Sequence, residues 1–350
     1  MKIESPKKDI RSLTLPEMEV VITSMGWPKF RAKQIWHWVW KQQQKDFAQM
    51  TNIPQEILQF LAEHYIFCEL IVDQTQKSLD GTIKNRIRLH DGQMIETVLI
   101  PVPRDNRFTV CVSSQVGCSL NCSFCATGKM KRIRNLEASE IFDQVSLVNK
   151  QCLEMYEHPL TNIVYMGMGE PLLNYKNVLR STQHISSVEG LGMSTKRITV
   201  STVGIEKMIR KLADDEVKFN LALSLHAADD DKRNSIMPIN EQNNLESLLA
   251  ALKYFYSKTK NRISYEYIAF DNFNDSIDDA KNLLKYCKSF PVKVNIIEYN
   301  PISGVEFEKS SEERVDKFAR YLKENGVMAT VRKSRGKDID AACGQLANKA

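Results

Sequence analysis

Residues 118–125 read Cys118-Ser-Leu-Asn-Cys122-Ser-Phe-Cys125, a run of three cysteines with the spacing CxxxCxxC. Three thiolates in one tight loop can hold three irons of a cubane cluster, which leaves the fourth iron open to a small chelating ligand. A zinc site and chance spacing are the alternatives. Structural zinc takes four ligands, and no histidine or fourth cysteine lies at zinc-finger spacing from this loop. The run therefore predicts a [4Fe-4S] cluster on Cys118, Cys122 and Cys125.

Around this loop, short β-branched runs alternate with longer amphipathic stretches. The predicted strands are Thr109–Ser113, Asn162–Met166, Arg197–Ser201, Phe219–Leu225, Ile263–Phe270, Val292–Tyr299 and Val327–Val331. The predicted helices include Glu137–Lys150, Ile205–Leu212, Leu245–Tyr256, Ile277–Tyr286 and Glu312–Asn325. Such alternation is typical of a parallel sheet with helical crossovers, so we expect an α/β fold, an open or partial (β/α) barrel. In such folds the chemistry lies at the carboxyl ends of the strands.

Two further parts precede the barrel. Residues 1–68 predict a small helical accessory domain, with helices that begin at Leu15-Pro16 and that cover Phe30–Gln44 and Pro54–Tyr65. Residues 69–101 predict a short β-meander, because two alternating runs flank Asp91-Gly92 and an earlier Asp80-Gly81 marks another turn. We therefore expect three domains, with the barrel and a C-terminal cysteine tail in residues 102–350.

The composition is that of an ordinary globular protein. The chain has 350 residues, of which 43% are hydrophobic and 26% charged, and this excludes disordered and collagen-like classes. No apolar stretch is long enough to cross a bilayer, and Met1–Pro6 has no signal-peptide pattern, so we expect a cytoplasmic protein without a membrane partner. The net charge of +5 permits a nucleic-acid partner but does not require one.

A second motif follows the second strand of the alternating region. Asn162–Met166 leads into Gly167-Met-Gly-Glu-Pro171. Glycine lets a backbone approach a ligand closely, and Glu170 can accept a hydrogen bond from an ammonium group. In radical S-adenosylmethionine (SAM) enzymes, the amino and carboxylate groups of SAM occupy the open iron. Because it comes after the three cysteines, the motif supports the prediction that SAM binds beside the cluster.

The chain resembles a known family, the radical SAM adenine-C2 RNA methyltransferases that act on 23S ribosomal RNA and on transfer RNA. The resemblance covers residues 95–346, and the N-terminal helices match more loosely. The motifs that carry it are Ile95-Glu-Thr-Val-Leu-Ile-Pro101, Cys111-Val-Ser-Ser-Gln-Val-Gly-Cys118, Gly167-Met-Gly-Glu-Pro-Leu-Leu-Asn174, Val200-Ser-Thr-Val-Gly204, Leu223-Ser-Leu-His-Ala227, Met237-Pro-Ile-Asn240, Tyr299-Asn-Pro301 and Asp338-Ile-Asp-Ala-Ala-Cys-Gly-Gln-Leu346.

The resemblance implies a role for each matching residue. Cys343 resembles the cysteine that a first SAM methylates, Cys111 the second catalytic cysteine, and Glu96 the proton acceptor. The residues that resemble SAM contacts are Gly169, Glu170, Ser201, Ser224, Leu225, His226 and Asn300. The implied substrates are adenosine 2503 of 23S ribosomal RNA and adenosine 37 of some transfer RNAs. We further expect a one-electron reductant of the flavodoxin or ferredoxin type and a monomeric enzyme.

Chemistry gives an independent reason for two extra cysteines. Carbon 2 of adenine is electron-poor and cannot attack the SAM methyl group, whereas a thiolate takes that methyl easily. A radical formed on the methylated Cys343 could add to the ring, and Cys111 would then release the product and leave a disulfide. The basic residues Arg332, Lys333, Arg335 and Lys337 predict a lowered pKa for the Cys343 thiol.

Seen alone, several of these residues have simpler interpretations. Cys111 in an apolar strand is typical of a core residue, His226 could be a satisfied core histidine, and Glu96 alternates like a solvent-facing strand residue. Three other cysteines occur singly in periodic apolar contexts and are expected in the core: Cys68, Cys152 and Cys287.

Two basic regions are candidates for RNA contact. All four tryptophans, Trp27, Trp36, Trp38 and Trp40, interleave with Lys29, Arg31, Lys33 and Lys41. Mixed basic and aromatic residues suit phosphate contact and base stacking, although Trp36 and Trp40 share one helix face and are expected in a core. A second basic run follows the cysteine loop and comprises Lys129, Lys131, Arg132 and Arg134. It could equally be a solvated surface.

Two other functions remain open at this point. Related enzymes methylate carbon 8 of the same ribosomal adenine and share the cysteine pattern, but carry alanine where this chain has Pro171. The other alternative is a non-catalytic, metal-binding RNA protein.

Overall fold

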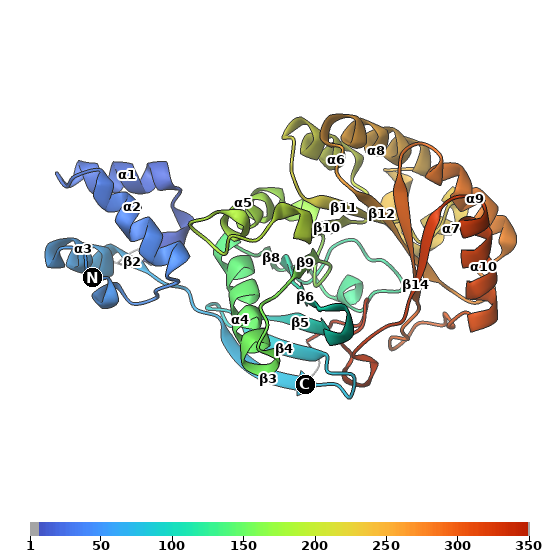
Figure 1. Cartoon of the computed structure of the whole chain (residues 1–350), viewed down its shortest axis with the longest axis horizontal. Helices are drawn as coiled ribbons and strands as arrows, with labels where there is room; N and C mark the ends of the chain where they lie inside the picture. The colour runs from blue at the N-terminus through green and yellow to red at the C-terminus, as the bar shows by residue number, and fades with distance from the viewer. Residues whose placement is uncertain (1–6, 349–350) are drawn as a thin grey trace.

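The computed structural model describes residues 7–348, and Met1–Pro6, predicted above to contain no signal peptide, lie outside the described residues. A small N-terminal helical domain lies at one end of the molecule, beside a large mixed α/β body (Figure 1). No helix among the described residues is long and apolar enough to span a membrane.

The N-terminal domain is helical, as predicted. Its elements are β1 (Lys8–Asp9), α1 (Leu15–Ser24), α2 (Phe30–Trp36), α3 (Gln55–His64) and β2 (Tyr65–Ile66). Thr14 and Glu17 form a capping box that satisfies the first free N–H groups of α1. The predicted second helix is not uniform, because α2 ends at Trp36 and continues as a π-helical turn, His37–Lys41. The two short strands pair in parallel and connect the start of the domain to its end.

One ten-stranded sheet forms the body, in the order β14-β13-β12-β11-β10-β9-β6-β5-β4-β3. Every neighbouring pair from β6 to β14 is parallel. The parallel strands are β6 (Arg107–Cys111), β9 (Asn162–Tyr165), β10 (Ile198–Thr202), β11 (Asn220–Ser224), β12 (Ile263–Ala269), β13 (Val292–Glu298) and β14 (Met328–Arg332). All the predicted strands are confirmed. The sheet stays open, because β3 and β14 are its edges, so the partial barrel is confirmed as well.

Helices connect the parallel strands. They are α4 (Ala138–Tyr156), α5 (Tyr175–Ser186), α6 (Glu206–Asp214), α7 (Asp230–Ile236), α8 (Leu245–Thr259), α9 (Ile277–Cys287) and α10 (Glu312–Glu324). The five helices predicted above are confirmed to within a few residues, except that α4 continues beyond Lys150 to Tyr156. Helices α5 and α7 fall in stretches for which no helix was predicted.

The antiparallel strands continue the same sheet. The predicted meander is β3 (Ile71–Lys77), β4 (Ile83–Arg88) and β5 (Met94–Val102), and β5 pairs antiparallel with β6. The sheet therefore runs unbroken across residue 101, at which the sequence analysis places a domain boundary. That boundary stays a prediction about independent folding.

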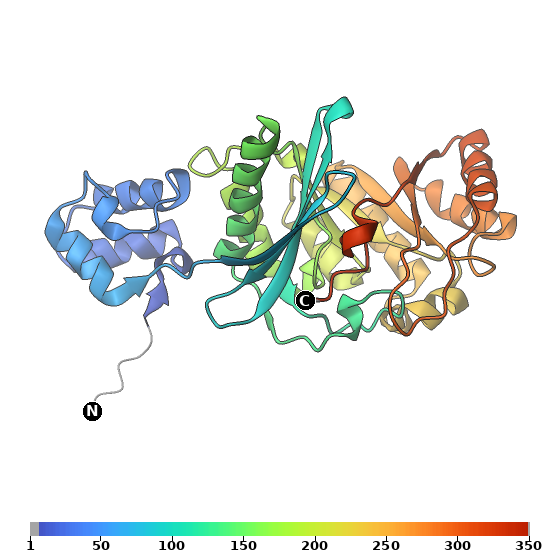
Figure 2. The ribbon, with the colours of Figure 1, turned by 90° about the horizontal axis from the view of Figure 1, so that it is seen from below.

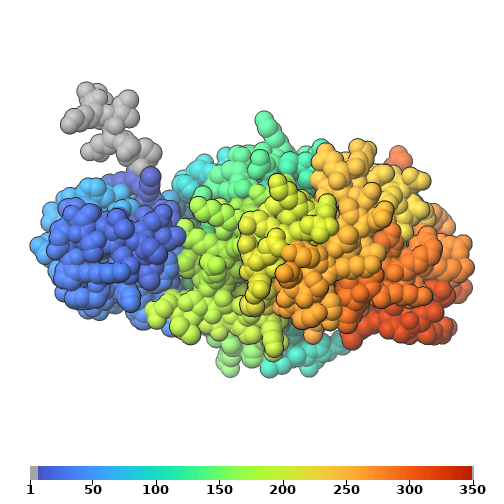
Figure 3. All heavy atoms as spheres, turned by 90° about the horizontal axis from the view of Figure 1, so that it is seen from above, coloured from blue at the N-terminus to red at the C-terminus, as the bar shows by residue number. Residues whose placement is uncertain are grey.

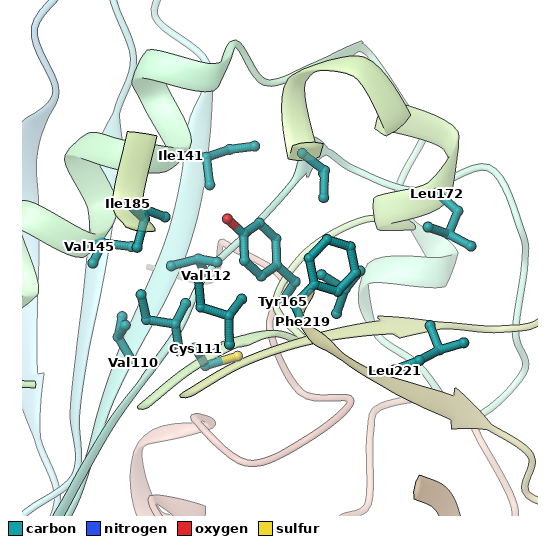
Figure 4. Close-up of a cluster of buried hydrophobic side chains, with 14 of the residues drawn as sticks. Val110, Cys111, Val112, Ile141, Val145, Tyr165, Leu172, Ile185, Phe219 and Leu221 are labelled. Carbon is teal, nitrogen blue, oxygen red and sulfur yellow. The ribbon is translucent and has the colours of Figure 1, made fainter. Parts of the chain in front are cut away.

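Apolar side chains fill the space between the sheet and its helices. Figure 4 shows part of this cluster, in which Val110 and Val112 lie near Tyr165 while Ile141 and Val145 come from α4. The cluster extends into the N-terminal domain, which packs against the green segment of the body in Figure 3. There, the Trp40 ring stacks on His184 of α5 at 3.6 Å between ring centroids. This contact confirms that Trp40 is a core residue.

Candidate active site at the carboxyl ends of the strands

The three-cysteine loop begins a few residues after β6 ends at Cys111. Two short strands, β7 (Gln115–Val116) and β8 (Arg134–Asn135), pair across the base of the loop and close it. Inside the loop, the Cys125 N–H donates to the Cys122 carbonyl at 3.2 Å. Gly128 packs so tightly that an added Cβ would lie 2.9 Å from the Cys122 carbonyl oxygen. Contacts within its own backbone therefore contribute to the loop conformation.

The thiols of Cys118, Cys122 and Cys125 are shielded from solvent by the surrounding protein. Burial raises the pKa of the Cys118 thiol to about 11, and it raises the pKa values of the Cys122 and Cys125 thiols too. For Cys118 and Cys122, the neighbouring cysteine sulfurs add to the shift. Grouped thiols that resist ionisation in this way are stabilised as thiolates when a metal binds, because the metal supplies the missing positive charge.

The loop offers three thiols, the number that a cubane cluster with one open iron uses, because each thiolate ligates a different iron. An apolar shell lines this side of the loop and includes Phe124, Ile236, Phe270 and Tyr299. Such a shell would limit solvent access to a bound cluster and so tune it.

The glycines after β9 pack closely against a neighbouring strand end. Gly167 and Gly169 both lie against residues that follow β6, and the predicted approach of this backbone to a ligand stays a prediction. A Cβ on Gly167 would lie 2.7 Å from the Val112 carbonyl oxygen, and one on Gly169, which has a φ of +95°, would lie 2.5 Å from Cβ of Gln115. The glycines therefore allow two neighbouring strand ends to pack together. Gln115 completes the contact by accepting from the Glu170 N–H at 2.9 Å.

Glu170 is held by the protein's own backbone. Its carboxylate accepts from the Leu172 N–H at 3.0 Å and from the Val203 N–H at 2.9 Å. Its side chain is buried, and this burial raises the pKa of the carboxyl to about 7 even though the two N–H groups lower it. The Glu170 N–H bonds to Gln115 of β7, the strand at the base of the cysteine loop. The structure thus brings the second sequence motif to the first.

The other predicted SAM contacts end neighbouring strands. Ser201 of β10 and Ser224 of β11 lie with their hydroxyl oxygens 3.4 Å apart. Leu225 and His226 follow Ser224, and both of their N–H groups donate to the Glu266 carbonyl on β12. The carboxyl ends of β9, β10 and β11 therefore gather Glu170, Ser201 and Ser224 on one side of the sheet, as expected for a parallel sheet.

His226 is a core histidine that also lies near the cysteine loop. It is buried, has a left-handed φ of 56°, and packs edge-to-face on Phe124 at 4.7 Å between ring centroids. Its Nδ1 accepts from the Ile268 N–H at 3.1 Å, which fixes the proton on Nε2. Burial lowers the pKa of the imidazole to about 3. His226 is thus a neutral, satisfied core histidine that also lies against the cysteine loop.

Arg233 is a site residue that the sequence analysis missed. It is fully buried on α7, and its guanidinium bonds to Asn240 and to backbone carbonyls. Its Nε donates to the Leu225 carbonyl at 3.0 Å, and its Nη2 donates to the Val203 and Ser224 carbonyls. The positive charge couples to Cys122. Arg233 therefore ties together the ends of β10 and β11 and faces the loop. Its position before Met237-Pro-Ile-Asn240 was the only available signal.

The C-terminal tail returns Cys343 to this site. The Ala126 N–H donates to the Gly344 carbonyl at 2.7 Å, and the Thr127 hydroxyl donates to the Leu346 carbonyl at 2.6 Å. Asn300, after β13, donates from Nδ2 to the Cys343 carbonyl at 3.3 Å. The tail is therefore fixed to the cysteine loop and to the end of β13. Asn300 contacts the tail directly, a contact not foreseen from the sequence.

The tail that carries Cys343 bonds to Glu96 of β5, the strand that pairs with β6 and its last residue, Cys111. Cys111 lies at the edge of the apolar cluster in Figure 4, and its thiol couples electrostatically to that of Cys343. All eight cysteines are free thiols, so a Cys111–Cys343 disulfide is not supported in this state. Burial raises the pKa of the Cys111 thiol. Cys68, Cys152 and Cys287 lie elsewhere, and Cys68 is only half-buried rather than a core residue.

The predicted low pKa of Cys343 is wrong. The Cys343 residue is exposed, but the surrounding protein desolvates its thiol and raises the thiol pKa, and the Glu266 carboxylate raises it further. Two of the basic residues that were expected to lower this pKa bind other groups. Lys337 pairs with Glu298 at 2.5 Å, and Arg335 donates to the Asp80 carbonyl. Arg332 and a backbone hydrogen bond of Cys343 itself lower the Cys343 pKa, but burial outweighs them.

Glu96 lies inside the protein and does not face solvent. Its side chain is 1% exposed, and Oε2 accepts from the Ala347 N–H at 2.9 Å and from the Asn348 N–H at 3.1 Å. Oε1 lies 3.4 Å from the Lys84 ammonium nitrogen. The carboxylate thus contacts the tail that carries Cys343, which brings all three predicted catalytic residues into one region.

Some residues of the two basic regions bind other groups of the protein and so are not available to RNA. Lys129 donates to the Ser303 and Gly304 carbonyls, and Arg134 pairs with Asp91 and Glu140. Lys131 and Arg132 are exposed. In the N-terminal domain, Trp40 is buried, while Trp27, Trp36 and Trp38 are half-buried. The surface available to RNA is therefore smaller than the sequence indicates.

Comparison with known proteins identifies the family. Residues 112–287 match the model of the Radical SAM superfamily, and residues 8–66 match that of the ribosomal RNA large subunit methyltransferase N-terminal domain. A probable dual-specificity RNA methyltransferase RlmN of Christiangramia forsetii is 51% identical over 348 residues, which cover 99% of this chain and 98% of that protein. This chain belongs to the RlmN family. It is a radical SAM RNA methyltransferase, an enzyme class that uses SAM and an iron–sulfur cluster.

More distant RlmN proteins match over nearly the whole chain. The dual-specificity RNA methyltransferase RlmN of Campylobacter hominis is 42% identical over 333 residues, covering 92% of this chain and 93% of that protein. The crystal structure of a radical SAM methyltransferase from Sphaerobacter thermophilus has a TM-score of 0.90 at 41% identity, and the match covers 98% of this chain and 100% of that one. Both the N-terminal domain and the open sheet therefore belong to a shared architecture.

Proposed function

We propose that this RlmN-family enzyme methylates carbon 2 of adenine in RNA, at adenosine 2503 of 23S ribosomal RNA and adenosine 37 of some transfer RNAs. Cys118, Cys122 and Cys125 would hold a [4Fe-4S] cluster through three thiolates. SAM would occupy the strand ends beside it. When bound, the cluster and SAM together supply a 5′-deoxyadenosyl radical, and the first of two SAM molecules per turnover supplies the methyl group.

The protein's own residues would then carry the methyl group. Cys343 accepts the methyl group as a thioether. This methyl would lose a hydrogen atom to the 5′-deoxyadenosyl radical before its carbon adds to ring carbon 2, and the one electron that the adduct then loses would return to the cluster. The Cys111 thiolate attacks the Cys343 sulfur, the carbon–sulfur bond breaks, and the released carbon takes a proton to become the product methyl group. Glu96 takes the proton from ring carbon 2. The disulfide left on the enzyme must be reduced before another cycle. A flavodoxin- or ferredoxin-type protein would supply the single electron that starts radical formation, and we expect the enzyme to act as a monomer.

The position of the tail is the observation that carries this proposal. The residues around Cys343 bond to the cysteine loop and to Glu96 of β5, and β5 pairs with β6, which ends at Cys111. Covalent transfer needs a carrier thiol and a resolving thiol that can reach each other, because exchange proceeds by attack of one sulfur on the other. This juxtaposition of residues from opposite ends of the sheet region supports the two-cysteine route.

The strand ends supply groups suited to SAM. Ser201 and Ser224 offer hydroxyls and Glu170 a carboxylate, and His226 carries its proton on Nε2. Gly169, Leu225 and Asn300 follow the carboxyl ends of β9, β11 and β13 on the same sheet. Lys131 and Arg132 remain exposed beside the loop, where they could contact RNA phosphates.

Reconstituted enzyme tests the proposal. Incubation with dithionite, SAM bearing a deuterated methyl group, and total RNA should yield 2-methyladenosine, identified by mass spectrometry of RNA digests. Digests of separated ribosomal and transfer RNA then identify the substrates. The appearance of 8-methyladenosine instead would assign the enzyme to the carbon-8 alternative, and an unmodified adenine with no SAM cleavage would reject the proposal.

A further inference from the structure

The turn between β3 and β4 supports the tail that carries Cys343. The Ser78 hydroxyl and the Leu79 N–H both donate to the Asp338 carboxylate, at 2.6 and 3.1 Å. The Gly336 N–H donates to the Asp80 carboxylate at 3.0 Å. Figure 2 shows the red C-terminal segment lying against the cyan strands of the meander. The turn predicted from Asp80-Gly81 is therefore a docking surface for the tail.

Lys84, on β4 just after this turn, has an unusual position. Its side chain is only 4% exposed, and its ammonium nitrogen lies 3.4 Å from Glu96 Oε1 and 3.4 Å from the Asp340 carbonyl oxygen. The other Glu96 oxygen accepts from Ala347 and Asn348. The Lys84–Glu96 pair thus contacts the tail on both sides of Cys343.

Burial makes this pair sensitive to the loss of either partner. Taking two charges out of water is costly, and the cost is offset only when each charge keeps its partner and its hydrogen bonds. If the ammonium group were absent, Glu96 would be left as a buried carboxylate whose remaining partners are the tail N–H groups. The tail N–H groups alone would then have to offset the burial of this charge, so the contact between Glu96 and the tail would weaken.

We propose that Lys84 is a positioning residue for methyl transfer, which holds Glu96 in place and holds the Cys343 segment against Cys111. It touches neither Cys343 nor Cys111, and it acts through the tail carbonyl and the Glu96 carboxylate. The inference rests on the proposed function, since it assigns Lys84 a part in transfer from Cys343.

Lys84→Met tests the role, because methionine is apolar and of similar length. Lys77→Met is the matched control, since Lys77 is an exposed lysine on the adjoining strand β3. Lys84→Arg should keep the charge and part of the function. Lys84→Gln gives a second neutral variant if Lys84→Met fails to fold.

Hydrogen–deuterium exchange on the full-length protein is the first measurement. Peptides from residues 338–348 should exchange about tenfold faster in Lys84→Met, a size expected for losing a buried charged hydrogen bond. Peptides from β10 and β12 should be unchanged, and Lys77→Met should match the wild type. Unchanged exchange in the tail would overturn the role, because the tail would then be held without Lys84.

The coupling ratio is the second measurement and separates positioning from simple stability. Reconstituted wild type should methylate RNA in proportion to the 5′-deoxyadenosine it forms. In Lys84→Met, methylated RNA per 5′-deoxyadenosine should fall about tenfold, with partial recovery in Lys84→Arg. A merely structural role would reduce the amount of active enzyme and leave this ratio unchanged, which would refute the inference. If wild type itself cleaves no SAM or methylates no RNA, the proposed function fails, whatever the exchange data show.

Discussion

The cysteine loop and the C-terminal tail both carry reactive cysteines but are held in place in different ways. The loop places Cys118, Cys122 and Cys125 through contacts within residues 115–135, from the β7–β8 pair to the close packing of Gly128. The tail places Cys343 through bonds to the loop, to Asn300, to Glu96 and to the turn at Ser78. One geometry is local and the other is assembled from distant parts of the chain.

The two regions have different chemical requirements. A cluster needs three ligands at fixed separations, and one short loop carries all three, although it also bonds to Ile236 and to the tail. A methyl carrier must be approached by SAM, by RNA and by Cys111 in turn. Several separate hydrogen bonds on a segment at the end of the chain can be released and remade at modest cost, since each contributes about 1 kcal/mol.

Removing a loop cysteine should have the largest effect. Cys122→Ala should lose the brown chromophore, most of the iron and all SAM cleavage, because two thiolates cannot replace three. Iron content and 5′-deoxyadenosine are measured after anaerobic reconstitution. Cys287→Ala is the control, since Cys287 is buried outside the site and should cost about 1–2 kcal/mol of stability with activity retained. Full iron and activity in Cys122→Ala would remove the loop from the mechanism.

Removing the tail cysteine should abolish transfer but spare the loop. Cys343→Ala should assemble the cluster and yet put no methyl group on RNA. Wild-type protein should carry a methyl group on Cys343, detected by peptide mass spectrometry. A normal rate of RNA methylation in Cys343→Ala would reject the covalent route.

Gly344→Ala tests the junction of the two regions. Gly344 has a φ of +85°, and an added Cβ would lie 3.3 Å from the Phe124 carbonyl oxygen. The left-handed conformation costs alanine about 1 kcal/mol, so RNA methylation should fall about fivefold while iron content stays unchanged. Gly26→Ala has a similar φ with no atom within 4 Å and lies far from the site, so it should leave methylation unchanged. Equal effects in both variants would argue against a special constraint at Gly344.

The smallest effect is expected where the turn between β3 and β4 bonds to the tail. Ser78→Ala removes one hydroxyl donor to Asp338, worth about 1 kcal/mol, and should speed tryptic cleavage at Lys337 several-fold. Ser257→Ala, on an exposed helix surface, is the control. If cleavage is as slow as in wild type, the turn does not hold the tail.

Local patterns in the sequence account for what could be predicted. The parallel strands follow from β-branched runs between amphipathic stretches, and the cysteine loop follows from its spacing. Glu170, Ser201 and Ser224 were placed together because the carboxyl ends of parallel strands share one edge of a sheet. None of these inferences depends on contacts between distant segments.

The features that were missed depend on such contacts. The Cys343 pKa was predicted from neighbours in sequence, whereas burial and Glu266 determine it in space. Glu96 alternates like an exposed strand residue, but the tail covers it. Arg233 and Lys84 are charged residues that no periodicity marks as buried. Their positions follow only from where helix α7 and the tail pack.

The central claim is that Cys343 carries the methyl group and Cys111 releases the product. Cys111→Ala tests it most directly, because this variant should form the new carbon–carbon bond and then stop. Protein purified from RNA-rich cells should migrate as an RNA adduct on denaturing gels, and ribonuclease should remove the adduct. Cys111→Ala combined with Cys343→Ala should show none. A free and fully active Cys111→Ala enzyme, weakened only by the loss of a buried thiol at about 1–2 kcal/mol, would contradict the claim.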